Sequence, residues 1–372
     1  MVNKERMIAE FMELVKIDSG SRKERLIADA LLLKLKELGY SAVEDQAGQA
    51  IGGDAGNLFL KIPGTAAGFT VLFCAHMDRV TPGLGINPQL LDDRIVSDGQ
   101  TILAADDLAG VVQILEMLRI LKEHELDHPN LEILFTISEE GGLFGAKNFD
   151  RSLSQADFAY FLDGGGDVGQ LIVQAPSQAK VNVIMHGKAA HAGIEPEKGI
   201  SAIVAASKAL AMMKLGRIDS ETTANIGIIT GGVATNIVCD KVEMRLEARS
   251  LSMLKLNEQT EHMKQVFLEA AKEMGTEVDV IIEESYPSYN LSSEDGIVKL
   301  AIAATEKIGR KPELVPTGGG SDANILNGRN LPSMVLANGL MNAHRLDEYI
   351  LISELVKGAE QILAIVDCAI TR

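Results

Sequence analysis

The chain has little aromatic material and little positive charge. Only 4% of its 372 residues are aromatic and none is Trp, so the core must depend on Ile, Leu, Val, Ala and Met. Lys and Arg number 35 against 52 Asp and Glu, which gives a formal net charge of -17. Because such a polyanion repels phosphate backbones and anionic lipid, nucleic acids and membrane surfaces are poor candidates for partners.

Cysteines and long apolar stretches are also scarce. Cys74, Cys239 and Cys368 lie far apart and form no CxxC pair. Their odd number argues against a disulfide framework and favours a reducing compartment. No apolar run approaches membrane-spanning length, and the charged, amphipathic segment 1–13 lacks the apolar stretch of a signal peptide. We therefore expect a cytoplasmic protein.

The apolar residues that are present, 46% of the chain, fall into runs of strand length. These runs are nearly continuous rather than alternating, which is typical of parallel strands buried on both faces. A segment with helical spacing, 108–121, separates the first two runs, and strands that alternate with helices indicate an α/β sheet. The four runs are 69–75, 131–137, 158–162 and 333–337.

The middle of the chain has a different order of elements. Strand patterns and helix patterns follow one another there as βαββαβ, which is typical of a small ferredoxin-like domain. A chain of 372 residues is long enough for two domains. We therefore predict a mostly parallel α/β catalytic domain, residues 1–176 and 287–372, with an inserted ferredoxin-like domain at 177–286.

Polar side chains follow each predicted parallel strand. In open α/β sheets, ligand sites form beyond the carboxyl ends of the strands, so these side chains should meet at one edge. An HxD motif or a Glu-Glu pair often occurs by chance. Potential ligands directly after each of four predicted strands are much less common by chance. The groups are His76 and Asp78, Glu139 and Glu140, Asp163, His344, and Asp106 just before the 108–121 helix.

Carboxylates and imidazoles in one cluster indicate a divalent metal site. Carboxylates alone would repel one another, and imidazole suits zinc, manganese or cobalt better than calcium. Asp78 can accept the second ring N–H of His76. Asp106 is placed to bridge two metals. Of the adjacent Glu139 and Glu140, one can bind a metal while the other acts as a base towards water.

The sequence also resembles the di-zinc aminoacylase and carboxypeptidase superfamily, and within it the peptidase T-like family. The resemblance spans residues 74–350, and its AAHAG and GGGSDAN segments are much more specific than HxD. The matching strings are CAHMDRV, LAADDLAG, FTISEEGGLFGAK, FLDGGG, HGKAAHAGIEPEKGISAI, ATNIVCD, PTGGGSDANILN and LMNAHRLDEYI.

The resemblance implies a role for each matching residue. One zinc would be held by His76 and Asp163, the other by Glu140 and His344, with Asp106 bridging. Asp78 would orient His76, and Glu139 would be the general base for the water that attacks the substrate. The inserted domain would act as a lid that often mediates dimerisation. Substrate would be held by His191, Asn236, Arg249, Gly319 and Ser321.

The predicted function is therefore that of a zinc exopeptidase acting on short peptides, most specifically a tripeptide aminopeptidase. Two zinc ions per chain are expected, and cobalt or manganese could substitute. A deacylase or carboxypeptidase with the same metals is the enzymatic alternative, because the residues alone separate these activities poorly. Relatives usually have a small hydroxyl residue after the last histidine, whereas this chain has Arg345, a departure that concerns the substrate class more than metal binding. A metal-dependent peptide-binding protein is the non-enzymatic alternative, but a binder has no need of Glu139. Expected partners are a peptide substrate and a second copy of the chain.

Overall fold

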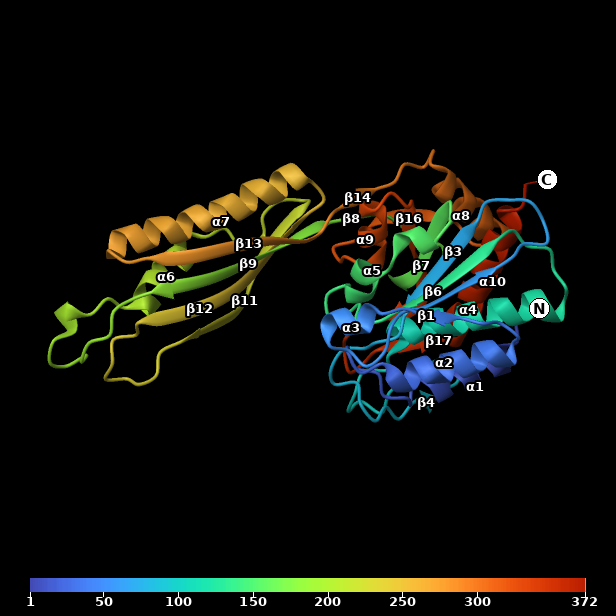
Figure 1. Ribbon diagram of the computed structural model, residues 1–372, viewed down its shortest axis with the longest axis horizontal. Coiled ribbons are helices and arrows are strands. Elements are labelled where there is room, and N and C mark those ends of the chain that lie inside the picture. Colours follow the sequence, from blue (N-terminus) through green and yellow to red (C-terminus); the bar gives the residue numbers. More distant parts are fainter. Residues whose placement is uncertain (372) are drawn as a thin grey trace. The chain divides into compact units, whose positions relative to one another are not determined.

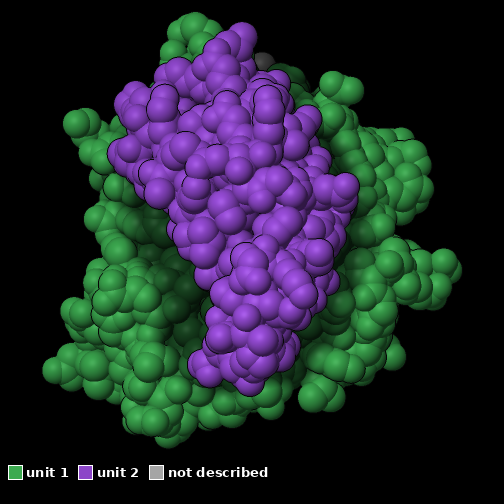
Figure 2. Space-filling view, turned by 90° about the vertical axis from the view of Figure 1, so that its left-hand side faces the viewer, with its two compact units in different colours: residues 1–173, 290–316, 321–372 green, residues 174–289, 317–320 purple. Residues whose placement is uncertain are grey.

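The computed structural model describes residues 1–371, and they divide into two compact units (Figures 1 and 2). Unit 1 comprises Met1–Val173, Asn290–Pro316 and Ser321–Arg372. Unit 2 comprises Gln174–Tyr289 and the short segment Thr317–Gly320. The two main junctions lie three residues from the borders expected at 176 and 287, and the separate segment 317–320 was not anticipated.

Four parallel strands form the centre of the unit 1 sheet, in the order β6, β3, β7, β16. Nearly all of their side chains are buried, because helices cover them and each strand has neighbours on both sides. This is the α/β arrangement that the continuous apolar runs predicted. The bounds are β3 Val71–His76, β6 Leu131–Thr136, β7 Phe158–Gly165 and β16 Ser333–Met341.

Further strands extend this sheet on both sides, and because several of them run antiparallel to their neighbours, the sheet is mixed. Most of them are only two to six residues long, too short to give a periodic apolar pattern, and the sequence analysis did not find them. On one side are β2 (Leu58–Ile62) and β1 (Val43–Glu44). On the other are β17 (Tyr349–Leu351), β5 (Arg94–Val96), β4 (Gln89–Leu90), β8 (Gln170–Ala175), β14 (Tyr289–Asn290) and β15 (Glu313–Pro316).

Helices of unit 1 pack on the central strands and complete its core. The long helix α4 (Ala105–Glu123) contacts β3, β7 and β16, and α10 (Ile352–Cys368) packs on α4, α8 and β16. Sixteen residues of α4 are buried, so this helix lies inside the unit and begins at the carboxyl ends of the strands. The others are α1 Lys4–Leu14, α2 Arg25–Glu37, α3 Ala47–Ile51, α5 Phe144–Asn148, α8 Gly296–Lys307 and α9 Asp322–Gly328.

Unit 2 is an antiparallel sheet with two helices, arranged in the strand order β10, β11, β12, β9, β13. From Ala179 to Met185, buried residues of β9 alternate with exposed or partly buried ones, because the helices cover only one face of this sheet. The ferredoxin-like βαββαβ order is present, with the two-residue strand β10 added. Bounds are β9 Ser177–His186, α6 Ala202–Met212, β10 Gly216–Arg217, β11 Thr222–Gly231, β12 Lys241–Ser250, α7 Met253–Met274 and β13 Val278–Tyr286.

Within residues 1–371, no helix combines the length and the apolar character needed to cross a lipid bilayer.

Candidate metal centre

All five predicted metal ligands belong to unit 1 and converge at the carboxyl ends of its parallel strands. His76 is the last residue of β3, and Asp163 lies in β7. Since Cys74 pairs with Phe161 in the parallel register, Asp163 stands level with His76. Glu140 follows β6, His344 follows β16, and Asp106 lies in the first turn of α4.

Asp106 lies between the two histidines and directs a different oxygen to each. Its Oδ1 is 3.0 Å from Nε2 of His76, and its Oδ2 is 3.2 Å from Nε2 of His344. Asp163 Oδ1 lies 3.9 Å from His76 Nε2, and Glu140 Oε1 lies 2.7 Å from His344 Nε2. The side chains therefore form two donor groups that share one carboxylate.

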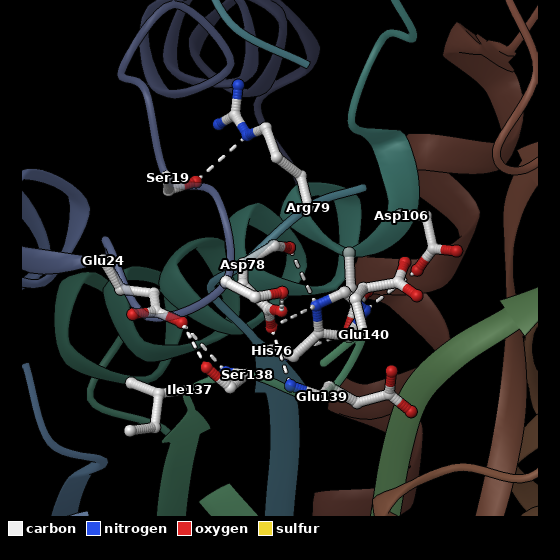
Figure 3. A network of polar contacts seen from close by, with 12 residues as sticks. Ser19, Glu24, His76, Asp78, Arg79, Asp106, Ile137, Ser138, Glu139 and Glu140 are labelled. Carbon is white, nitrogen blue, oxygen red and sulfur yellow. Dashed lines mark hydrogen bonds and ion pairs between the residues drawn. The ribbon is translucent and has the colours of Figure 1, made fainter. Parts of the chain in front are cut away.

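Donor atoms from both groups are close enough to hold a cation. His76, Asp106 and Glu140 each offer a ligand atom, and these atoms lie within 4.8 Å of one another. Figure 3 shows the same three side chains gathered together. A set of imidazoles and carboxylates with this spacing fits zinc, cobalt or manganese rather than calcium.

The electrostatics of the cluster also favour a divalent cation. Burial and the neighbouring Asp106 raise the pKa of Asp163 well above its usual value. Hydrogen bonds to Asp106 and Glu140 raise the pKa of His344 to about 10. Although burial opposes it, the carboxylates of Asp106 and Asp78 raise the pKa of His76. These shifts all favour the protonated forms of Asp163, His344 and His76, as expected where negative charge is concentrated in a buried site, and a divalent cation would balance that charge.

Asp78 links the first histidine to the predicted base. Its carboxylate accepts hydrogen bonds from the Ser21 hydroxyl at 2.5 Å and from the backbone N–H of Glu139 at 2.8 Å. Nδ1 of His76 is 3.0 Å from the main-chain oxygen of Asp78 and 3.5 Å from its Oδ1. The ring is therefore oriented first by the Asp78 carbonyl, where the sequence analysis expected the carboxylate.

Glu139 and Glu140 point in different directions, as Figure 3 shows. Glu140 reaches the His344 ring, whereas no such ion pair joins Glu139 to a histidine in the described part of the chain. Glu139 is 9% exposed, and burial together with Asp163 raises its pKa well above the usual value. A carboxyl group beside the donor cluster but outside it is placed to exchange protons there.

Glu24 holds the turn that carries this glutamate pair, and the sequence analysis did not find it. Its Oε1 accepts from the N–H of Ser138 at 3.0 Å, the hydroxyl of Ser138 at 2.9 Å and the N–H of Arg22 at 2.8 Å. Ser138 has φ +48°, a conformation that needs support in a non-glycine residue. Glu24 is fully buried, and burial together with Asp78 raises its pKa.

Asp107 adjoins Asp106 before the 108–121 helix, and the sequence analysis assigned no separate role to Asp107. Its Oδ2 accepts from the backbone N–H of His76 at 3.2 Å, and its Oδ1 accepts from Gly110 at 3.2 Å and from the Asn338 amide at 3.1 Å. It therefore joins β3, α4 and β16 directly beneath the cluster. The sequence predicted the bridging role of Asp106 but not these supporting contacts of Asp107.

Four of the five predicted substrate residues lie in unit 2. His191 and Asn236 are exposed and adjacent, because the N–H of Ala192 donates to the Asn236 carbonyl at 2.9 Å. Arg249 donates to the Gly318 carbonyl at 3.3 Å and so lies beside Gly319. Ser321 belongs to unit 1, where it forms the capping box of α9 with Asn324, so its hydroxyl is already used by that helix.

Comparisons with known proteins identify the family. Residues 72–367 match the peptidase family M20/M25/M40. The uncharacterized protein YqjE of Bacillus subtilis is 47% identical over 99% of both chains, and peptidase T of Clostridium botulinum is 28% identical over 97% of this chain and 98% of its own.

Two solved structures are similar over nearly their whole length. One, the aminopeptidase PepT of Bacillus cereus, is 48% identical with a TM-score of 0.91 and covers 99% of each chain. The other, a tripeptidase of Staphylococcus aureus, is 39% identical with a TM-score of 0.94 and covers 98% of each chain. The chain therefore belongs to peptidase family M20/M25/M40, and it is a metallopeptidase that resembles peptidase T.

Proposed function

We propose that this metallopeptidase is a zinc-dependent exopeptidase that removes the N-terminal residue from short peptides, with tripeptides as its main substrates. The support for this specificity is similarity to an aminopeptidase and a tripeptidase, at 48% and 39% identity. The proposed metal site is supported separately, by the arrangement of its own residues, and does not depend on this similarity.

The observation on which the metal site depends is the shared carboxylate of Asp106. His76 and Asp163 would hold one zinc ion, Glu140 and His344 the other, and Asp106 would bind both, because each of its oxygens faces a different histidine. Bound in this way, two zinc ions would polarise the peptide carbonyl and make water more acidic.

Glu139 supplies the proton transfers in this proposal. Hydrolysis needs an acceptor for the proton of the attacking water and a donor to the leaving amine, and one carboxylate can serve both in turn. Glu139 is bound to no histidine of the cluster, so its carboxylate stays available. The hydrogen bond from its N–H to Asp78 at 2.8 Å fixes its main chain, which keeps the side chain at the donor groups.

Unit 2 would supply the substrate contacts. His191 would contact the peptide near the reacting carbonyl, and Asn236, Arg249 and the glycine segment that includes Gly319 would hold its backbone. Ser321, whose hydroxyl caps α9, would contribute through its main chain.

A peptide panel tests the proposed reaction. Purified protein, with zinc, cobalt or manganese supplied separately, is given tripeptides with free termini, a blocked N-terminus or a blocked C-terminus. We expect hydrolysis at the first peptide bond that requires a free amino group. Cleavage that needs only a free carboxylate would indicate a carboxypeptidase, and release of the blocking acyl group would indicate a deacylase.

Metal content tests the shared carboxylate. We expect two divalent ions per chain in saturated wild-type protein. Asp106→Ala should lose tight binding of both ions, because both donor groups depend on this residue. Asp92→Ala, which changes an exposed aspartate outside the segments that carry the ligands, is the control and should keep both. An Asp106→Ala protein that keeps its full metal content would contradict the bridging role.

A further inference from the structure

Two loop segments of unit 1 each carry a proposed metal ligand: 97–106, whose last two residues begin α4, and 342–348. Asp106 ends the first, and His344 lies in the second. The loops lie side by side because β17, which follows the second, pairs with β5, which precedes the first: Ile350 is opposite Ile95. In addition, the Ser97 hydroxyl donates to the Thr101 carbonyl at 2.6 Å and lies 3.4 Å from the Leu346 carbonyl.

The side chain of Glu348 connects these loops. It is fully buried, and its Oε2 accepts from the N–H of Leu103 at 2.8 Å and from the N–H of Ala104 at 3.1 Å. Its Oε1 accepts from the N–H of Asp106 at 3.1 Å. One carboxylate from the His344 loop therefore satisfies three main-chain donors in the segment that leads to Asp106.

Both loops have backbone conformations that need such support. Ala104 has φ +61° and His344 has φ +65°, in the left-handed region that non-glycine residues rarely adopt. Non-glycine residues keep a left-handed backbone conformation only when surrounding contacts hold them in it. The three donors satisfied by Glu348 surround Ala104, and Glu348 itself lies four residues after His344, so its side chain ties the backbone around Ala104 to the loop that carries His344.

We propose that Glu348 is a positioning residue that couples the two ligands, Asp106 and His344, and so sets the spacing between the two metal sites. It would act through the backbone, because its carboxylate oxygens are engaged by the N–H groups of Leu103, Ala104 and Asp106. This inference rests on the proposed metal site. Residues that orient metal ligands typically contribute on the order of 10–100-fold to metal affinity.

The isosteric substitution Glu348→Gln separates positioning from simple packing. A carboxamide keeps the volume but has one acceptor oxygen and an NH2 group. If the oxygen faces Leu103 and Ala104, the NH2 group faces the N–H of Asp106, and that donor loses its partner. Glu348→Ala removes all three hydrogen bonds and is the stronger variant.

A matched control is available in Glu354, which is 3% exposed. It also accepts a main-chain hydrogen bond, from the N–H of Val168 at 2.8 Å, and it pairs with Arg310. It contacts none of the proposed ligands in the described residues. Glu354→Gln therefore reproduces the loss of a buried carboxylate without touching the ligand loops.

Two measurements test the inference. In metal-free protein, hydrogen exchange at the amide of Asp106 should be faster in Glu348→Gln than in wild type, and exchange at the amides of Leu103, Ala104 and Asp106 should all be faster in Glu348→Ala. Exchange at these amides should be unchanged in Glu354→Gln. In zinc titrations, Glu348→Gln should bind on the order of 10–100-fold more weakly, while Glu354→Gln binds as wild type does.

The outcomes distinguish this inference from the proposed function. If wild type binds two ions and Glu348→Gln binds them equally tightly with unchanged exchange, the positioning role is wrong while the metal site stands. If Glu354→Gln weakens zinc binding as much as Glu348→Gln does, the effect is general destabilisation and the inference is again overturned. If wild type binds no divalent ion, the proposed function fails, and the inference fails with it.

Discussion

Glu139 and Glu140 are neighbours in the chain but have different surroundings. Glu140 lies 2.7 Å from His344, while the main chain of Glu139 is held by Asp78 and its side chain points elsewhere. We expect Glu139→Gln to keep two metal ions and to lower kcat by about 10²–10⁴-fold, because a general base is removed. Glu140→Gln should lose one ion. Measured zinc content beside kcat decides between them, and the opposite pattern would mean that the two roles are reversed.

A second prediction concerns Glu24 and pH. Its folded-state pKa is raised above the usual 4.5 by burial and by Asp78, and its Oε2 has no hydrogen-bond partner. A raised carboxyl pKa means that the folded state holds its proton more tightly, so the stability that this group contributes is complete below pH ~4.5 and declines as pH rises through the folded pKa.

Glu24→Gln cannot ionise and should lack this decline. The measurement is urea unfolding of metal-free wild type and Glu24→Gln at about pH 5 and about pH 8. We expect the difference in free energy of unfolding to move in favour of the variant at the higher pH. A difference that is independent of pH would show that Glu24 has an ordinary pKa in the folded protein.

Among the elements of unit 1, the segment after α1 is joined to the end of β3 by Arg79. This side chain is 3% exposed and donates to the carbonyls of Val15 at 2.8 Å and Ile17 at 2.7 Å and to the Ser19 hydroxyl at 3.0 Å. Burial lowers its pKa to about 10, so it stays charged at neutral pH.

Arg79→Leu should destabilise unit 1, because buried acceptors are left without a donor. Each such loss typically costs about 1–3 kcal/mol, so we expect the free energy of unfolding to fall by at least about 2 kcal/mol in urea titrations. Arg94→Leu, which removes a partly exposed arginine paired with Asp93, should change it little. Equal effects of the two substitutions would refute this role.

At the scale of the whole molecule, the proposed metal ligands and the proposed substrate residue His191 belong to different units. Every proposed metal ligand lies in unit 1, whereas His191 lies in unit 2. We therefore expect His191→Ala to lower kcat by about 10²–10³-fold, as for loss of one donor to a reacting carbonyl, with two zinc ions retained.

The matched control is His186→Ala, in the same unit, where the histidine pairs with Asp279 at 2.8 Å. It should leave kcat unchanged. Zinc lost in proportion to activity in His191→Ala would count against the substrate role.

Strand β11 provides a prediction about assembly. Along Asn225–Gly231 it pairs only with β12 within the described residues, and Ile228 and Ile229 are 49% and 55% exposed. An open edge with apolar residues favours pairing with another strand. We expect a homodimer in sedimentation experiments and a monomer for Ile229→Lys, whereas Lys255→Ala, on the helical side of unit 2, should not alter the mass. A monomeric wild type would contradict the prediction.

The amino-acid sequence by itself determined the α/β class and the polar groups at the strand ends. Continuous apolar runs such as 131–137 predict buried parallel strands, and the parallel arrangement brings whatever follows them to one edge. His76, Asp163 and His344 could therefore be grouped from the sequence alone. The ferredoxin-like order of unit 2 was predictable for a similar reason, since its strands and helices are long enough to show their periods.

Only the tertiary structure decided how these groups are held. Glu24 contacts Ser138 across 114 residues of sequence, and Glu348 contacts Leu103 across 245. Each of these contacts joins a carboxylate to main-chain N–H groups, which are the same in every residue but proline and so leave no mark on the sequence. Strand ends are specified by local apolar pattern, whereas the spacing of the ligands depends on loops whose conformation is fixed by partners far away in the chain.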